Sequence, residues 1–174
     1  MKVYDTNFIK DQFPALKRKV WDKKLVYLDS AASMQKPKRV LDSISKSYSF
    51  NYSNVHRGLH KLSEEATAKY EGSRIKVAKF INCSENEVIF TSGATAALNL
   101  IAYSWGTKNL SAGDEIIITI AEHHANIVPW QIIAEQKNVK IKAAHVDPNS
   151  DFNSDIIKEL VTDKTKIIAF PHVS

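Results

Sequence analysis

A short segment at residues 91–95, Thr-Ser-Gly-Ala-Thr, combines hydroxyl groups and a glycine directly before an apolar helical pattern. Threonine and serine often cap helices, and glycine allows a backbone to approach a ligand closely. The first turn of a helix has free N–H groups and the positive end of the helix dipole, so it attracts anions. We therefore expect a phosphate group to bind at Ala94 and Thr95.

A second segment, residues 122–130 (Glu-His-His-Ala-Asn-Ile-Val-Pro-Trp), places His123, His124 and Asn126 after an apolar run at residues 115–120. In an open α/β sheet, ligands bind at the carboxyl ends of the strands, so these side chains are candidates for a site. The residues alone leave two other interpretations open. The histidines can belong to a surface loop, or they can bind zinc, although no further ligands occur at metal-binding spacing.

Apolar periodicity predicts the elements that position these segments. The expected strands are residues 25–28, 87–91, 115–120, 139–146 and 166–170. The expected helices are residues 6–19 with an end near Pro14, 37–50, 61–82, 94–105, 129–136 and one helix after an Asn153 cap. Because strands alternate with helices, we predict an α/β fold with a mostly parallel sheet and helices on both faces.

Several of these elements carry patterns that predict burial. The apolar stripe of the helix that begins at Pro37 consists of Val40, Leu41, Ile44 and Tyr48. Residues 61–82 are expected to form a core helix, and residues 166–170 a buried strand. Residues 87–120 are expected to form one βαβ-like unit, with a strand, a helix and a second strand.

Composition limits the class of protein. The 174 residues are 44% hydrophobic, which is enough for a core. The formal charge is +5, but Lys and Arg are spread among 19 acidic residues without a basic run, which argues against nucleic-acid binding. The N-terminus lacks the apolar core of a signal peptide and no run is long enough to span a bilayer, so we expect a cytoplasmic protein without a membrane partner. The single cysteine, Cys83, has no neighbouring base in sequence, so we expect a structural role.

Four motifs together resemble a known family. They are residues 27–33 (Tyr-Leu-Asp-Ser-Ala-Ala-Ser), 55–60 (Val-His-Arg-Gly-Leu-His), 91–95 and 122–130. In this order and spacing, and in register from about Phe8 to Ser174, the chain resembles the SUF-type (group II) cysteine desulfurases of the class V aminotransferase superfamily. The resemblance implies the large domain of PLP-dependent transferase fold type I, with pyridoxal 5'-phosphate (PLP) as the cofactor.

The resemblance also implies roles for individual residues. The Thr95 hydroxyl, with the N–H groups of Ala94 and Thr95, would bind the PLP phosphate. His123 would be catalytic, stacking on the pyridine ring and moving protons during C–S cleavage. A further group of residues would line the active site or contact the substrate. This group consists of Ala31, Ala32, His56, Arg57 and Asn126.

The activity implied by the resemblance is conversion of L-cysteine to L-alanine, with the sulfur left on the enzyme as a persulfide. A sulfur-acceptor protein would then carry this sulfur to iron–sulfur cluster assembly, and the complete enzyme would be a homodimer. The alternatives are a selenocysteine lyase, which acts on selenocysteine, and another class V enzyme such as a kynureninase-like hydrolase. A non-catalytic folded remnant is a third alternative.

The sequence departs from the family pattern at two places. Ala96 occupies a position where the family has an acidic residue, so the contact made by that acid is not expected here. The chain stops at Ser174, before the family's acidic partner for the PLP nitrogen, its histidine–lysine pair, its catalytic cysteine and its substrate-binding arginines. We therefore expect residues 1–174 to be an incomplete PLP-binding large domain that lacks its C-terminal half and is inactive alone. Residues 1–36 would pack at the active-site mouth, and residues 167–170 would form an unpaired apolar edge.

Overall fold

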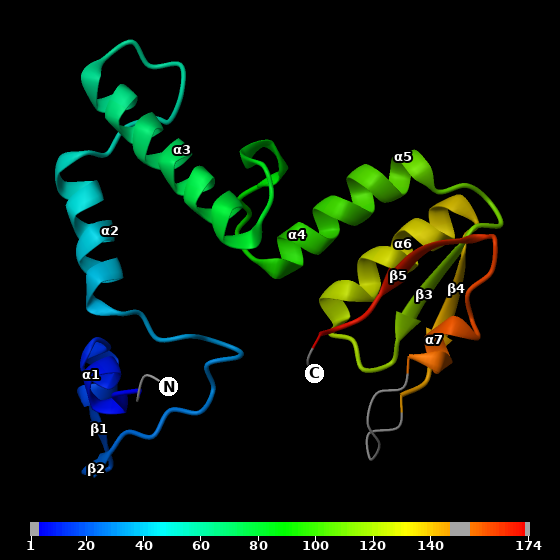
Figure 1. Cartoon of the computed structure of the whole chain (residues 1–174), viewed down its shortest axis with the longest axis horizontal. Helices are drawn as coiled ribbons and strands as arrows, with labels where there is room; N and C mark the ends of the chain where they lie inside the picture. The colour runs from blue at the N-terminus through cyan, green and yellow to red at the C-terminus, as the bar shows by residue number, and fades with distance from the viewer. Residues whose placement is uncertain (1–3, 147–153, 173–174) are drawn as a thin grey trace. The chain divides into compact units, whose positions relative to one another are not determined.

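The computed structural model describes residues 4–146 and 154–172 and divides after Val88 into two compact units. Figure 1 labels the elements of each unit. The expected grouping of residues 1–174 into one large domain, with residues 1–36 at the mouth of a site, stays a prediction. The expected Asn153 cap lies outside the described residues.

The second unit is built on a parallel sheet of three strands. β3 (Glu115–Thr119) lies in the middle, between β4 (Lys140–Ala144) and β5 (Thr165–Ala169). Every residue of β3 is buried, as is typical of a central strand in a parallel sheet. The strands predicted at residues 115–120, 139–146 and 166–170 are therefore confirmed, with ends that differ by one or two residues.

Helices cover both faces of this sheet (Figure 1). α6 (Val128–Lys137) packs on the face that carries Ile116, and α7 (Asp155–Lys158) packs on the face that carries Ile117. Neighbouring residues of a strand point to opposite faces, so these two clusters lie on opposite sides of β3. The cluster under α6 consists of Ala102, Leu110, Ile116, Ile118, Trp130, Ile133, Ala134 and Val139. The predicted α/β fold with helices on both faces of a parallel sheet is confirmed.

The helix predicted at residues 94–105 is present and is longer than expected. α4 (Ala94–Ile101) continues through a π-helical turn, η3 (Ala102–Gly106), into α5 (Thr107–Asn109). Gly106 is buried against α6, where an added Cβ would lie 3.3 Å from Trp130 Cζ3. A larger residue at this position would therefore push the two helices apart.

The first unit is mostly helical. Its helices are α1 (Thr6–Asp11), η1 (Pro14–Lys17), α2 (Lys38–Phe50), α3 (Lys61–Ile81) and η2 (Glu85–Glu87). The Asp5 carboxylate caps α1 by accepting hydrogen bonds from the Asn7 and Phe8 N–H groups at 3.0 Å. The helices predicted from sequence in this region are confirmed, apart from shifts of a few residues at their ends.

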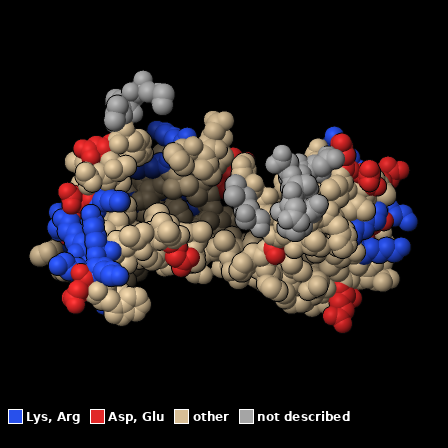
Figure 2. Space-filling model, turned by 90° about the horizontal axis from the view of Figure 1, so that it is seen from below, with Lys and Arg blue, Asp and Glu red and all other residues tan. Residues whose placement is uncertain are grey.

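The only strands among the described residues of the first unit form a small hairpin, β1 (Lys19–Val20) and β2 (Lys23–Lys24). Trp21 and Asp22 join them with positive φ angles of 50° and 59°, as in a two-residue turn whose twist matches antiparallel strands. Lys and Arg side chains gather over this N-terminal part of the chain in Figure 2. Short strands with many lysines offer a poor edge for pairing with other chains.

Two predicted strands are wrong. Residues 25–28 and 87–91 have no strand pairing in the structure. Val26 and Leu28 are 75% and 91% exposed, so their β-forming side chains contact little. A β-strand needs a neighbour to satisfy its backbone, and beyond one hydrogen bond of 3.2 Å from the Leu25 N–H to the Arg18 carbonyl no described segment pairs with these residues. The predicted βαβ-like unit therefore lacks its first strand.

The predicted burial in the first unit is also wrong. The α2 stripe is exposed along its length, from Val40 at 37% to Tyr48 at 69%. α3 is not a core helix, because Ser63 and Ala78 are its only buried residues. In the second unit, β5 alternates between half-buried and exposed residues at the edge of the sheet, so it is not the buried strand that was predicted. An apolar pattern identifies the face of an element but not the surface that covers it.

A buried carboxylate joins the three strands at the start of β3. Glu115 Oε2 lies 2.6 Å from Lys142 Nζ on β4 and accepts a hydrogen bond of 2.5 Å from the Thr162 hydroxyl, which precedes β5. Lys142 Nζ also donates to the Leu160 carbonyl at 3.0 Å. The hydrogen bond from Lys142, followed by that from Thr162, lowers the pKa of Glu115 below its ordinary value.

We expect Glu115→Gln to lower the urea midpoint of the second unit at pH 7, followed through the fluorescence of Trp105 and Trp130. Because the folded state lowers the pKa of Glu115, its contribution to stability is present above the ordinary glutamate value of 4.5 and is lost as pH falls through the folded value. The difference between wild type and variant should therefore shrink in acid. Glu135→Gln, at an exposed position on α6, is the matched control and should leave the midpoint unchanged. An unchanged Glu115→Gln midpoint at pH 7 would contradict this account.

Candidate functional site

The first turn of α4 presents free backbone donors. Gly93 precedes the helix with φ 158° and ψ 178°, a backbone region open essentially to glycine alone. Thr91 donates its hydroxyl to the Gly93 carbonyl at 3.0 Å, and no side chain caps the helix. Within the described part of the chain, the N–H groups of Ala94, Thr95 and Ala96 have no hydrogen-bond partner. The segment is therefore arranged as an anion-binding helix terminus.

The surroundings of this turn are open enough for a ligand. Thr95 is exposed, and its carbonyl accepts a hydrogen bond of 2.8 Å from Asn99 Nδ2. The Thr95 hydroxyl makes no hydrogen bond to any described residue and is available to a ligand. A Cβ added at Gly93 would meet no atom within 4 Å. The donors and the space fit a phosphate group, and the binding of phosphate at Ala94 and Thr95 stays a prediction.

His123 lies in the loop that follows β3. It precedes the short helix η4 (His124–Asn126), and its Nδ1 accepts a hydrogen bond of 3.0 Å from the Ala125 N–H. The neutral ring therefore carries its hydrogen on Nε2, and the exposed imidazole has a defined orientation. The His124 ring lies edge-on to it, with centroids 6.3 Å apart.

Both ends of the Asn126 side-chain amide make hydrogen bonds to other residues of this unit. Its Nδ2 donates to Glu122 Oε1 at 2.9 Å, and its Oδ1 accepts from Trp130 Nε1 at 3.0 Å. These bonds tie the loop to α6, and sequence analysis missed both partners. A role for Asn126 in contacting the substrate stays a prediction, but the structure already uses both ends of its amide.

The structure brings the two chemical segments of the second unit together, because α4 contacts η4. α4, whose first turn contains Thr95, therefore packs against η4, which His123 precedes. Thr119, the last residue of β3, adds a buried hydroxyl without a hydrogen-bond partner among the described residues. Such a group is rare in folded proteins, and no sequence pattern marks it.

Two further predicted residues, Ala31 and Ala32, belong to the first unit. They are exposed in a turn where the Ser33 N–H donates to the Asp29 carbonyl at 3.0 Å. The Tyr27 hydroxyl braces this turn by donating to the carbonyls of Asp29 and Ser33. The turn exposes small side chains and backbone, and its role in binding a substrate stays a prediction.

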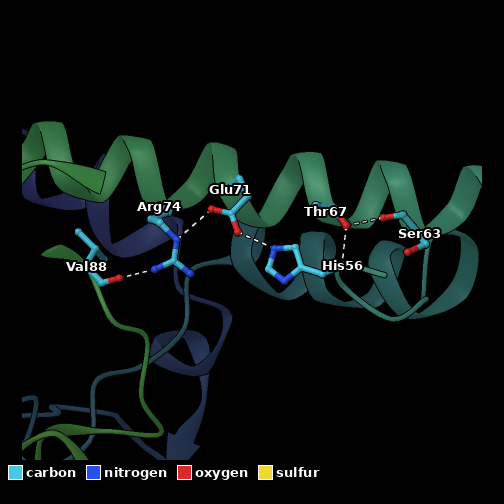
Figure 3. A network of polar contacts seen from close by, with 6 residues as sticks. All are labelled: His56, Ser63, Thr67, Glu71, Arg74 and Val88. Carbon is cyan, nitrogen blue, oxygen red and sulfur yellow. Dashed lines mark hydrogen bonds and ion pairs between the residues drawn. The ribbon is translucent and has the colours of Figure 1, made fainter. Parts of the chain in front are cut away.

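His56 and Arg57 also belong to the first unit, in a left-handed turn with φ angles of 64° and 55°. Figure 3 shows the contacts that hold His56 on α3. The ring Nε2 of His56 lies 2.8 Å from Glu71 Oε1, and the backbone N–H of His56 donates to Thr67 Oγ1 at 2.9 Å. Glu71 also pairs with Arg74, at 2.9 Å. The hydrogen bond from His56 is the largest cause of the lowered pKa of Glu71.

Residues 26–174 match the aminotransferase class-V family. The chain belongs to this family. The match covers both compact units and includes all of the predicted site residues. The class V assignment made from the four motifs is thereby confirmed, whereas the narrower SUF-type group stays a prediction.

Several similar proteins are named as probable cysteine desulfurases. A protein of Synechocystis named as a probable cysteine desulfurase is 46% identical over 167 residues, covering 95% of this chain and 40% of its own length. A probable cysteine desulfurase of Staphylococcus aureus is 46% identical over 172 residues, covering 98% of this chain and 42% of its own length. This chain thus spans about 40% of the length of these relatives.

Solved structures agree with this family fold. An apo cysteine desulfurase from Thermococcus onnurineus is 31% identical and superposes with a TM-score of 0.87, covering 99% of this chain and 41% of that protein. The cysteine desulfurase CsdA from Escherichia coli is 36% identical, with a TM-score of 0.79, covering 96% of this chain and 41% of that protein. The fold of this chain is therefore that of known cysteine desulfurase structures, whereas its assignment to a large domain stays a prediction.

Two other features bear on the kind of site. Across residues 4–146 and 154–172, no three acidic, histidine or cysteine side chains come together as a metal site. None of the helices in the described ranges combines the length and apolar character needed to cross a membrane.

Proposed function

We propose that this chain forms part of a PLP-dependent cysteine desulfurase that converts L-cysteine to L-alanine. The observation that carries the proposal is the free helix terminus at Ala94 and Thr95, on a helix that contacts η4 after His123, in a chain that is 46% identical to probable cysteine desulfurases. The sulfur would pass through an enzyme persulfide to an acceptor protein, for iron–sulfur cluster assembly. The complete protein would be a cytoplasmic homodimer of the SUF type.

The residues present fit PLP. The N–H groups of Ala94 and Thr95 and the Thr95 hydroxyl would bind its phosphate, since each of these donors is free in the described structure. PLP supplies an electron sink that stabilises negative charge on the substrate carbon. The His123 ring, oriented by Ala125, would lie against the cofactor ring and move a proton at Nε2. Ala31, Ala32, His56 and Arg57 would line the substrate side of the site.

The direct test is to purify the protein as its gene encodes it, add PLP and L-cysteine, and measure alanine and sulfide in the presence of a reductant. We expect equal amounts of the two products. A parallel reaction with L-selenocysteine distinguishes the desulfurase from a selenocysteine lyase, which would turn over the selenium substrate alone. If PLP binds and neither substrate reacts, the proposed activity is wrong for this protein.

We expect Thr95→Val to weaken PLP binding by about tenfold to a hundredfold, because a hydrogen bond to a charged group contributes about 1.5–3 kcal/mol. Valine keeps the shape of threonine and removes the hydroxyl. Affinity is measured by equilibrium dialysis with PLP and with pyridoxal, which lacks the phosphate. The loss should appear for PLP and not for pyridoxal. Thr107→Val, at an exposed position in α5, is the matched control, and equal PLP affinity of all three proteins would exclude the phosphate role.

A further inference from the structure

The turn at His56 and Arg57 is an unfavourable backbone conformation. Both residues have positive φ angles, 64° and 55°, although neither is glycine. The left-handed conformation is unfavourable for any residue that carries a Cβ, because the Cβ comes close to the following carbonyl oxygen. Two in succession persist when surrounding contacts hold them, and such strained turns concentrate at functional sites. The contacts of this turn therefore show which residues support it and which side chain it presents to solvent.

Every polar group of His56 outside Nδ1 is engaged by the fold. The N–H donates to Thr67 Oγ1 at 2.9 Å, and the carbonyl accepts from Asn54 Nδ2 at 2.9 Å. Nε2 lies 2.8 Å from Glu71 Oε1, and the ring meets the Tyr70 ring edge-on at 5.9 Å. His56 is thus held from three sides and belongs to the structural support of the turn.

Gly58, which follows Arg57, also attaches the turn to α3. A Cβ at this position would lie 2.2 Å from Ser63 Oγ, so only glycine fits there. Ser63 is buried and donates its hydroxyl to the Asn54 carbonyl at 2.9 Å. Arg57, between two anchored residues, is exposed and makes no ion pair within the described part of the chain. The turn therefore presents the Arg57 guanidinium from a fixed backbone.

Glu71 is the residue on which this support depends. Its two carboxylate oxygens face different partners, with Oε1 toward His56 and Oε2 at 2.9 Å from Arg74 Nε (Figure 3). Arg74 is itself fixed, because it donates to the Val88 carbonyl and lies over the Tyr70 ring at 5.1 Å. Arg74 therefore fixes the position of the Glu71 carboxylate independently of its contact with the His56 imidazole.

We propose that Glu71 is a positioning residue, which orients Arg57 toward its ligand by holding His56 in the left-handed turn. Arg57 contacts the ligand, and His56 and Glu71 act through it. The ligand side of this inference rests on the proposed function, in which Arg57 lines the site. The support itself is a property of the first unit, so it can be measured without cofactor or substrate.

The first measurement is the imidazole ¹⁵N spectrum of the chain, with the His56 signal assigned through His56→Gln. In the wild type we expect a fixed tautomer with hydrogen on Nε2, since this atom donates to Glu71. Glu71→Ala should convert the signal to tautomer averaging, and Glu71→Gln, whose amide oxygen still accepts, should retain the Nε2–H form. Averaging in the wild type, or a fixed tautomer in Glu71→Ala, would overturn the proposal.

The second measurement is trypsin cleavage of the Arg57–Gly58 bond, followed by mass spectrometry. Cleavage requires local opening, so its rate reports the population of the open turn. We expect a roughly fivefold faster cleavage in Glu71→Ala, in line with the loss of a partly exposed charge pair, and an intermediate rate in Glu71→Gln. Glu64→Ala, at an exposed position on α3, is the matched control and should cleave as the wild type does. Equal rates in all four proteins would overturn the proposal, whether or not the protein acts on cysteine.

Discussion

In the complete enzyme, replacing His123 by alanine is expected to slow the release of alanine from L-cysteine by about a hundredfold or more, because a positioned acid or base contributes about 10²–10⁴ in rate. The Ala125 N–H fixes the ring through Nδ1 and leaves Nε2 for the reaction. Binding of PLP should weaken much less, since its phosphate is assigned to Ala94 and Thr95. The effect should therefore appear in turnover rather than in cofactor affinity.

His124→Ala is the matched control for this prediction. His124 is exposed, lies in the same loop and makes no hydrogen bond to the backbone in the described structure through its ring. Its removal should leave turnover near the wild-type rate. Steady-state production of alanine and PLP affinity are measured for both variants. If His124→Ala has the larger effect on turnover, or if His123→Ala retains full turnover, the assignment of the catalytic imidazole is wrong.

The second large effect is expected in the core of the sheet unit. Ile133→Ala should lower the free energy of unfolding of this unit by about 2–5 kcal/mol, because it removes buried methyl groups and leaves a cavity. Ile133 is 0% exposed and packs in the cluster between α6 and β3. It also lies against Gly106, which limits how far the neighbouring helix can move into the space. The cavity should therefore stay largely open.

Urea unfolding at pH 7, followed by the fluorescence of the buried Trp130, measures this change. Ile120→Ala is the matched control, because Ile120 lies in the same unit and is 51% exposed. It should change the free energy of unfolding by less than about 1 kcal/mol. A similar loss in both variants would mean that the packing around Ile133 is looser than described.

Local pattern was enough to predict the elements of the sheet unit. The apolar run that became β3 and the helical spacing that became α4 and α6 are short-range features, and Pro129 lies in the first turn of its helix as expected. The anion-binding terminus at Thr95 could be predicted for the same reason. A glycine and a helix start are adjacent in sequence and need no distant partner, although the expected Thr or Ser side-chain cap is not formed.

The sequence could not predict which hydrogen bonds the candidate site residues make within the protein. The Asn126 amide makes hydrogen bonds to Glu122 and Trp130, and the His56 ring makes one to Glu71, fifteen positions away. Such bonds depend on where a loop meets a helix. The motifs identified these residues as a group. The structure separates Arg57, which makes no ion pair with any described residue, from His56, whose polar groups support the turn.

The sequence by itself determined the α/β class, the order of the elements in the sheet unit and the class V family motifs, because these follow from periodicity and from adjacent residues. Tertiary structure decided which apolar segments pair and which faces are covered. Residues 25–28 and 87–91 have strand-forming side chains but no neighbour to pair with, and the α2 stripe has the spacing of a buried face but stays exposed. Pairing and burial depend on a second surface, and the sequence of one segment carries no information about whether that surface is present.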